Sequence, residues 1–336
     1  IQTANKIVSS GFEQNENVQE IVEDAEKSIM EVSEKRNSNG FQSIADVLNQ
    51  TIENIDELAQ NNEEITGLPT GYQALDKMTA GLQKDELLII AARPAVGKTA
   101  FALNIAQNVG TKTDNTVAIF SLEMGAESLV SRMLCAEGSI DASHLRTGQL
   151  TDEEWRNLIV AMGSLSKASI YIDDTPGIKV SEIRARCRKL AQEKGNLGLI
   201  LIDYLQLIEG SGRESRQQEV SEISRQLKKL AKEMNVPVVA LSQLSRGVEQ
   251  RQDKRPVLSD IRESGSIEQD ADIVAFLYRD DYYQRENEEE EEEAGNDNVI
   301  EVIIEKNRNG ARGTVELLFI KEYNKFSSLS PRTAFE

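Results

Sequence analysis

The segment AARPAVGKTA, residues 91–100, contains a lysine and a hydroxyl side chain in the order that phosphate-binding loops use. It comes after an apolar run and opens a helical pattern, so the loop lies between an expected strand and an expected helix. Backbone N–H groups at the start of such a helix favour anionic phosphates, while the lysine reaches the terminal phosphates and the threonine can ligate Mg²⁺. The sequence therefore predicts a nucleotide-phosphate site formed by Ala92, Arg93, Pro94, Ala95, Val96, Gly97, Lys98 and Thr99.

Three further polar residues end apolar runs that have the character of buried strands. Asp203 ends LGLILID and could hold Mg²⁺ through water, together with Thr99. Glu123 ends TVAIFSLE, where a carboxylate could orient and deprotonate an attacking water; the alternative, an acid that only interacts with a following helix dipole, stays open. Gln243 ends VPVVALSQL and could sense the γ-phosphate by a hydrogen bond.

The elements that must position these residues alternate along the chain. Apolar, β-branched runs alternate with stripes of period 3.6 after residue 85, which predicts an α/β fold with a mostly parallel sheet and helices on both faces. The sequence TDEE predicts a capping box that starts a helix at Thr151. The runs ADIVAFLYRD, NVIEVIIEKNR and GTVELLFIKEYN predict later strands, with antiparallel additions to the sheet at the C-terminus.

Composition limits the classes of protein that fit. The chain has 336 residues and a formal net charge of −19, which argues against a generally basic, DNA-coating surface but not against one local groove. Cys135 and Cys187 lack metal or redox spacing and are expected to be buried thiols, and the lone His144 is not expected to be a ligand. Scarce cysteines and the absence of a signal sequence predict a cytoplasmic protein.

The N-terminal part has a different character. Residues 1–40 are acidic and weakly amphipathic, and the chain starts at Ile1, so we expect this part to be the tail of a preceding domain. Residues 41–66 are predicted to form a linker with an amphipathic helix over 41–60, and residues 67–336 the ATPase domain. The apolar face of the helix could pack on its own domain or dock on a neighbouring subunit, and the sequence favours neither.

Six blocks, in order, resemble one family. ARPAVGKTAFALNIA, FSLEM, LILIDYLQLI, LSQLSRGVEQR, RESGSIEQDAD and EKNRNGARG are similar to the RecA-like motor domain of bacterial replicative hexameric DNA helicases of the DnaB family. The resemblance extends from about Phe41 to the C-terminus and implies a RecA-like P-loop NTPase domain preceded by a helical linker. In that family the loop also begins with alanine, so the resemblance implies that Ala92 is tolerated and that the loop binds ATP with Mg²⁺.

The resemblance also implies roles for single residues and for partners. Glu123 would be the catalytic base, Gln243 the sensor, and Lys306 and Arg308 a basic pair inserted into the neighbouring subunit's ATP site. The implied assembly is a homo-hexamer that moves 5′ to 3′ on single-stranded DNA and unwinds duplex DNA during replication. Primase and a helicase loader are the implied protein partners, in part through an N-terminal domain.

Loops that leave the nucleotide-proximal edge of the sheet are expected to contact DNA. Arg213 lies in the loop 209–220, and Arg246 and Arg251 lie in the loop 245–256. The resemblance adds Arg262, Glu263 and Gly265 in the RESG segment as the part nearest the DNA backbone. Contacts to DNA phosphates carry no sequence information, so binding is expected to be sequence-independent and salt-sensitive. Few aromatic residues occur in these loops, which argues against base stacking. The alternatives are an ATP-dependent DNA-binding switch or loader, and a RecA-like recombinase without unwinding activity.

Overall fold

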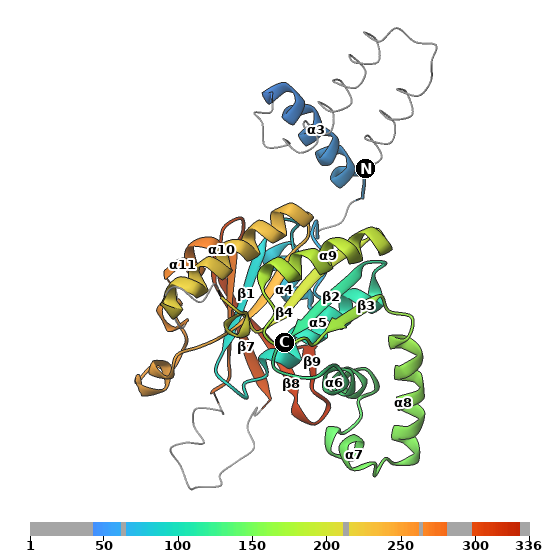
Figure 1. Ribbon diagram of the computed structural model, residues 1–336. Helices are drawn as coiled ribbons and strands as arrows, with labels where there is room; N and C mark the ends of the chain where they lie inside the picture. Colours follow the sequence, from blue (N-terminus) through green and yellow to red (C-terminus); the bar gives the residue numbers. More distant parts are fainter. Residues whose placement is uncertain (1–42, 62–64, 211–214, 262–264, 281–297, 330–336) are drawn as a thin grey trace, which may run out of the picture. The chain divides into compact units, whose positions relative to one another are not determined.

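A computed structural model describes residues 43–61, 65–210, 215–261, 265–280 and 298–329. The chain divides into two units, Ile1–Glu63 and Glu64–Glu336. In the first unit the described element is the helix α3 (Ile44–Asn61), which confirms the helix predicted there (Figure 1). The predictions for residues 1–40 lie outside the described residues.

The described part of the second unit is built on a nine-stranded sheet with the order β3-β2-β4-β5-β1-β6-β7-β8-β9 (Figure 1). The strands from β3 to β6 in this order run parallel, and β7, β8 and β9 continue the sheet in antiparallel pairs. The sheet therefore confirms the predicted class. The strands are β1 (Leu87–Ala92), β2 (Thr116–Ser121), β3 (Ile170–Asp173), β4 (Leu197–Asp203), β5 (Val238–Gln243), β6 (Ile273–Tyr278), β7 (Val299–Asn307), β8 (Gly313–Ile320) and β9 (Lys325–Ser328).

Helices follow most of the parallel strands, as βα repeats require. The α-helices are α4 (Gln73–Thr79), α5 (Lys98–Lys112), α6 (Ala126–Gly138), α7 (Ala142–Thr147), α8 (Asp152–Leu165), α9 (Val180–Lys194), α10 (Arg216–Met234) and α11 (Gly265–Asp270). Short 3₁₀ turns are η1 (Leu205–Leu207), η2 (Arg246–Gln250), η3 (Leu258–Asp260) and η4 (Lys321–Tyr323).

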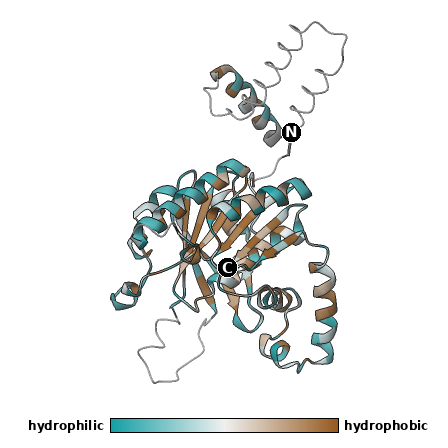
Figure 2. Ribbon diagram, viewed as in Figure 1, coloured by the Kyte–Doolittle hydropathy of each residue, from teal (hydrophilic) through white to brown (hydrophobic). Residues whose placement is uncertain are grey.

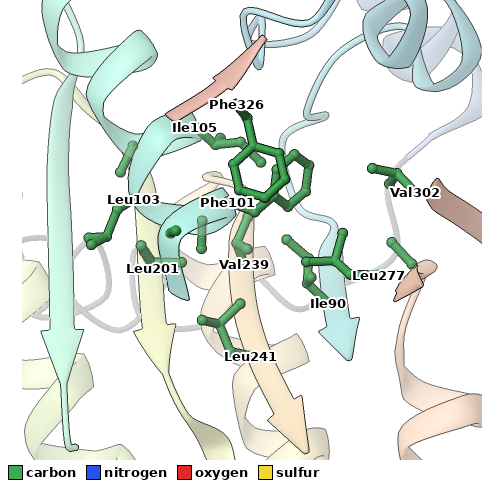
Figure 3. Packing of buried hydrophobic residues seen from close by; sticks show 14 of the residues in the cluster. Ile90, Phe101, Leu103, Ile105, Leu201, Val239, Leu241, Leu277, Val302 and Phe326 are labelled. Carbon is green, nitrogen blue, oxygen red and sulfur yellow. The ribbon is translucent and has the colours of Figure 1, made fainter. Parts of the chain in front are cut away.

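Both faces of the sheet are covered, because successive side chains of a strand point to opposite faces. On β1, Ile90 belongs to the cluster that includes α4, α5 and α6, whereas Ile89 belongs to the cluster with α9, α10 and α11. Figure 3 shows the first cluster, where the rings of Phe101 and Phe326 lie with centroids 5.1 Å apart. Figure 2 shows the strands as hydrophobic and the outer sides of α9 and α10 as hydrophilic.

Local signals in the sequence predicted several details correctly. The capping box at Thr151 is present, with reciprocal hydrogen bonds to Glu154, and both cysteines are buried and free. The terminal strand β9 was not predicted, because its four residues follow β8 after one 3₁₀ turn and have no separate apolar run. Within the described residues, no helix is both long enough and apolar enough to cross a membrane.

Candidate functional site

A pocket of about 340 Å³ lies where the phosphate loop meets the ends of β1, β4 and β5. Because these strands are parallel, their carboxyl ends meet at one edge of the sheet, which is where α/β proteins bind ligands. The predicted loop residues come together here with Glu123 and Gln243, except Val96, whose side chain is buried in the hydrophobic core and does not line the pocket. The pocket is lined by Ala92, Arg93, Pro94, Ala95, Gly97, Lys98, Thr99, Ala100, Glu123, Met124, Arg132, Tyr204, Gln243, Phe319 and Asn324.

The backbone of the loop depends on one glycine. Gly97 has φ +112°, which strains any residue with a side chain, and a Cβ there would also lie only 3.2 Å from Cε1 of Phe319 on β8. Ala95 also adopts the left-handed region, at φ 64°, which costs a non-glycine residue about 1 kcal/mol or more. Gly97 directly precedes α5, so the first free N–H groups of that helix face the pocket.

Lys98 is one of three cationic side chains that line the pocket, with Arg93 and Arg132. Burial lowers the pKa of its ammonium group, while the carboxylates of Asp203 and Glu123 act in the opposite direction. Its Nζ lies 4.7 Å from the ring centroid of Tyr204, within the range of a cation–π contact. A bound phosphate would supply the negative charge that favours the protonated lysine.

Thr99 and Asp203 form the candidate metal site. The threonine hydroxyl donates a hydrogen bond to Oδ2 of Asp203 over 2.8 Å, so the two predicted ligands are in contact. The carboxylate is 3% exposed, and its buried Oδ1 accepts no hydrogen bond from any described residue. A buried carboxylate oxygen without a donor beside a hydroxyl oxygen fits Mg²⁺, which binds few protein oxygens and takes its other ligands from water and phosphate.

Glu123 follows β2 and Gln243 ends β5, the two strands that flank β4 in the sheet. Glu123 is exposed, in the turn after β2, so the predicted strand ends two residues earlier than expected, at Ser121. Gln243 is the last residue of β5, and Ala92 is its register partner on β1. Both side chains line the pocket, but their roles in hydrolysis stay predictions.

The side chain of Arg93 contacts the segment that follows β5. Its Nε forms an ion pair with Oε1 of Glu249 at 2.6 Å, and its Nη1 donates a hydrogen bond to the carbonyl of Leu244 at 2.9 Å. The side chain is 9% exposed and lies between the pocket and a second cavity, of about 520 Å³, beside Gln243 and Arg246. The phosphate loop is therefore attached to the segment that follows β5.

The basic pair at the end of β7 is distant from this pocket. Lys306 donates to the carbonyls of Glu268 and Ala271, each at 2.6 Å, at the C-terminus of α11, and burial lowers the pKa of its ammonium group. Arg308 donates to the carbonyl of Gln269 at 2.6 Å and forms an ion pair with Asp272 at 3.3 Å. Cations at a helix C-terminus are favoured by its free carbonyls and dipole.

Strand register gives the separation between the two sites. β1 pairs with β6 through Leu88 and Ile273, and Ile273 pairs with Asn307 on β7. Arg308 therefore lies level with the start of β1, while the phosphate loop leaves its end, about 16 Å further along the strand. An arginine side chain is much shorter than this distance, so Arg308 cannot reach the phosphate pocket of its own chain.

The predicted DNA contacts have different surroundings. Arg246 is exposed at the start of η2 and lines the second cavity. Arg251 forms an ion pair with the buried Asp260 at 2.8 Å, so its guanidinium has a structural partner. Gly265 is the first residue of α11. Arg213, Arg262 and Glu263 lie outside the described residues, and DNA contact by any of the six stays a prediction.

Several pocket residues were not predicted from the sequence. Tyr204, Arg132, Phe319 and Asn324 come from four separate segments, and only tertiary structure brings them to the loop. The position of Tyr204, directly after Asp203, was the one available signal. The contact between its ring and Nζ of Lys98 is known from the distance between them, and the residue type alone could not predict it.

Comparison with known proteins agrees with this geometry. The family model described as "DnaB-like helicase C terminal domain" matches residues 67–328. The replicative DNA helicase DnaC of Bacillus subtilis (strain 168) is 66% identical over 99% of this chain and 72% of its own length. The replicative DNA helicase DnaB of Geobacillus stearothermophilus is 63% identical over the same shares.

Two solved structures are similar as well. The chain described as "ATPase Domain of G40P" has a TM-score of 0.80 and 44% identity, with 87% of this chain and all of that chain covered. A DnaB-like replicative helicase, described together with its interactions with primase, has a TM-score of 0.77 and 42% identity, covering 98% of this chain and 75% of its own. Since the family model covers most of the sequence and close relatives align over nearly all of it, the chain belongs to the DnaB-like family of bacterial replicative DNA helicases, a class of ATP-dependent enzymes.

Proposed function

We propose that this chain is the ATP-driven motor of a homo-hexameric ring that moves 5′ to 3′ along single-stranded DNA in the cytoplasm and separates the duplex during replication. Sequence-independent contacts to DNA phosphates would hold the strand. Primase is a proposed partner because one of the similar helicases was solved and described with its interactions with primase. A helicase loader is proposed only from the family resemblance.

The separation between the phosphate loop and Arg308 is the observation that carries this proposal. Lys98, Thr99 and Asp203 meet at one edge of the sheet, and Arg308 lies at the other. A site that needs both parts must take them from two copies of the chain. This supports hydrolysis at subunit boundaries, with the arginine supplied in trans.

Each of these residues has its own proposed role in ATP hydrolysis. Lys98 and the loop N–H groups would bind the terminal phosphates of ATP, and Thr99 and Asp203 would hold Mg²⁺, which neutralises phosphate charge when bound. Glu123 would accept the proton of the attacking water, and Gln243 would hydrogen-bond the γ-phosphate. A neighbour's Arg308 would stabilise charge that develops on the transferred group.

The first test is the mass of the purified chain by light scattering with ATP and Mg²⁺, together with ATPase rates with and without single-stranded DNA. We expect a mass near six chains and hydrolysis stimulated by DNA, because complete sites form only between copies. The stimulation should weaken as salt rises, since phosphate contacts release counterions. A monomer whose hydrolysis ignores DNA would contradict the proposal, and DNA stimulation without strand separation would favour the switch or recombinase alternative.

The helix α3 is proposed to dock on a neighbouring copy. Ile44, Leu48, Ile52 and Ile55 are spaced along one face of α3, and all four are exposed. An exposed apolar stripe of this length is typical of an interaction surface.

An apolar stripe on α8 is a fitting partner surface for α3. On α8, Trp155, Ile159 and Met162 follow the same helical spacing and are 51%, 66% and 55% exposed. We therefore pair α3 of one copy with α8 of another, which would join the subunits by two apolar helix faces.

Replacing Ile159 by Asp should weaken assembly, because it places a charge in the centre of the proposed apolar contact. We expect the mass measured with ATP and Mg²⁺ to fall towards that of the single chain. Val160→Asp is the matched control: Val160 is also exposed on α8 but points roughly 100° away from Ile159. Equal masses for Ile159→Asp and the unmodified chain would argue against this use of α8.

A further inference from the structure

We propose that Glu249 is a positioning residue that couples the phosphate loop to the segment after β5, so that nucleotide binding and DNA binding affect each other through the Arg93–Glu249 ion pair. The inference rests on the proposed function and adds a specific connection within the same chain. Glu249 is not among the residues that line the pocket, and it contacts the pocket through Arg93, which does line it.

The ion pair joins two segments that are distant in sequence. Arg93 is the second residue of the phosphate loop, and Glu249 lies in η2, beyond the strand that ends at Gln243. The backbone adds two contacts, because the Leu244 N–H donates to the carbonyl of Ala92 at 3.1 Å and the Leu244 carbonyl accepts from Arg93. A change in the loop around phosphate that displaces the Arg93 guanidinium would therefore act on Glu249 through this ion pair.

The segment after β5 is held together as one unit. Arg251 binds both oxygens of Asp260, at 3.2 and 2.8 Å, and the Ser245 N–H donates to the carbonyl of Asp260 at 2.8 Å. Leu244 and Ile261 form an isolated β-bridge, so the segment begins and ends at the same place. Because its two ends are tied together, displacement of η2 is passed to Ile261.

Ile261 directly precedes residues that the proposed function assigns to DNA contact. Residues 262–265 follow it directly and include three of the predicted DNA contacts. Beyond them, the end of α11 holds Lys306 and Arg308. Arg246, also a predicted DNA contact, lies in η2 together with Glu249. Through Arg93 and Glu249, the phosphate loop is thus connected to a described segment with a predicted DNA contact.

The partial burial of the Arg93–Glu249 ion pair explains why the negative charge of Glu249 is important. Arg93 is nearly buried, and its partner carboxylate is 22% exposed, so the pair is only partly screened by water. A neutral amide in place of the carboxylate leaves the guanidinium without its counter-charge, while the Leu244 carbonyl still holds it in the loop. The loop can then keep its shape and lose its attachment to η2.

The test compares Glu249→Gln with the unmodified chain, using oligodeoxythymidylate as the single strand. We expect basal ATPase and the KM for ATP to change little, and stimulation by the single strand to fall by about fivefold or more. Coupling between sites is reciprocal, so the affinity for the single strand should lose its dependence on a non-hydrolysable ATP analogue. Glu249→Asp, which keeps the charge, should recover part of both effects.

Glu233→Gln is the matched control, since it also removes a carboxylate held by arginines, but on α10 away from the pocket. Normal coupling in Glu249→Gln would overturn the inference, as would a raised KM with reduced basal turnover, which would mean that Glu249 only supports the loop. If the unmodified chain shows no stimulation by DNA, the proposed function fails and the coupling fails with it. If the unmodified chain is stimulated and Glu249→Gln is stimulated equally, the coupling alone fails.

Discussion

Glu123→Gln should abolish ATP hydrolysis and leave ATP binding intact. The side chain keeps its size and its place in the pocket but can no longer accept a proton from the attacking water. General-base catalysis contributes about 10²–10⁴-fold, so turnover should fall by that order, both with and without DNA. Phosphate release and equilibrium binding of a fluorescent ATP analogue together measure the two effects.

Glu127→Gln provides the control for this substitution, because Glu127 is an exposed acid in the first turn of α6 and does not line the pocket. It should behave as the unmodified chain does. Retained hydrolysis in Glu123→Gln would remove this residue from the mechanism. It would leave the alternative in which Glu123 only interacts with the helix dipole of α6.

Mixing Arg308→Ala chains with Lys98→Ala chains should restore hydrolysis that neither variant shows alone. Arg308→Ala should lose roughly 10³-fold or more in rate, since an arginine supplied in trans contributes that much to phosphoryl transfer. Lys98→Ala should also be inactive, because it lacks the cation proposed to bind the terminal phosphates. In a mixed ring, one chain supplies an intact phosphate loop and its neighbour an intact Arg308. Roughly a quarter of the boundaries in a random equal mixture would be complete, because each of the two positions is filled correctly half the time.

The measurement is ATPase rate against the mixing ratio, with mass recorded at each point so that lost assembly is not mistaken for lost catalysis. Arg312→Ala is the control within the same turn, because Arg312 is exposed and lies a few residues after Arg308. A mixture that assembles but gains no activity over the separate variants would rule out the shared site.

The sequence predicted the structure correctly where a local pattern of residues is compatible with only one kind of element. Each predicted apolar run became a strand. In β1, β2, β5 and β6 the apolar residues are buried on both faces, as a parallel sheet covered by helices requires, whereas β7 alternates between buried and partly exposed residues in an antiparallel pair. The loop ending in Lys98 and Thr99, and the strand ending in Asp203, met as expected, since the carboxyl ends of parallel strands lie at one edge.

Contacts between distant segments could not be predicted in the same way. Nothing local to Arg93 indicates that Glu249, 156 positions away, will be its partner. Arg251 was predicted to contact DNA from its charge and its loop, but the structure pairs it with Asp260, which sequence spacing did not suggest. Many acids could pair with an exposed arginine, and only the folded chain selects one of them.

The placement of the phosphate loop and Arg308 at opposite edges of one sheet has a consequence for assembly. Two complementary surfaces on different sides of a subunit make a head-to-tail contact, which cannot close as a twofold dimer and must grow as a filament or close as a cycle. An open chain of such subunits leaves one loop without an arginine at one end and one arginine without a loop at the other. The number of complete catalytic sites would then equal the number of contacts between subunits and not the number of subunits. Closing an open chain into a ring would add one complete site without adding a subunit.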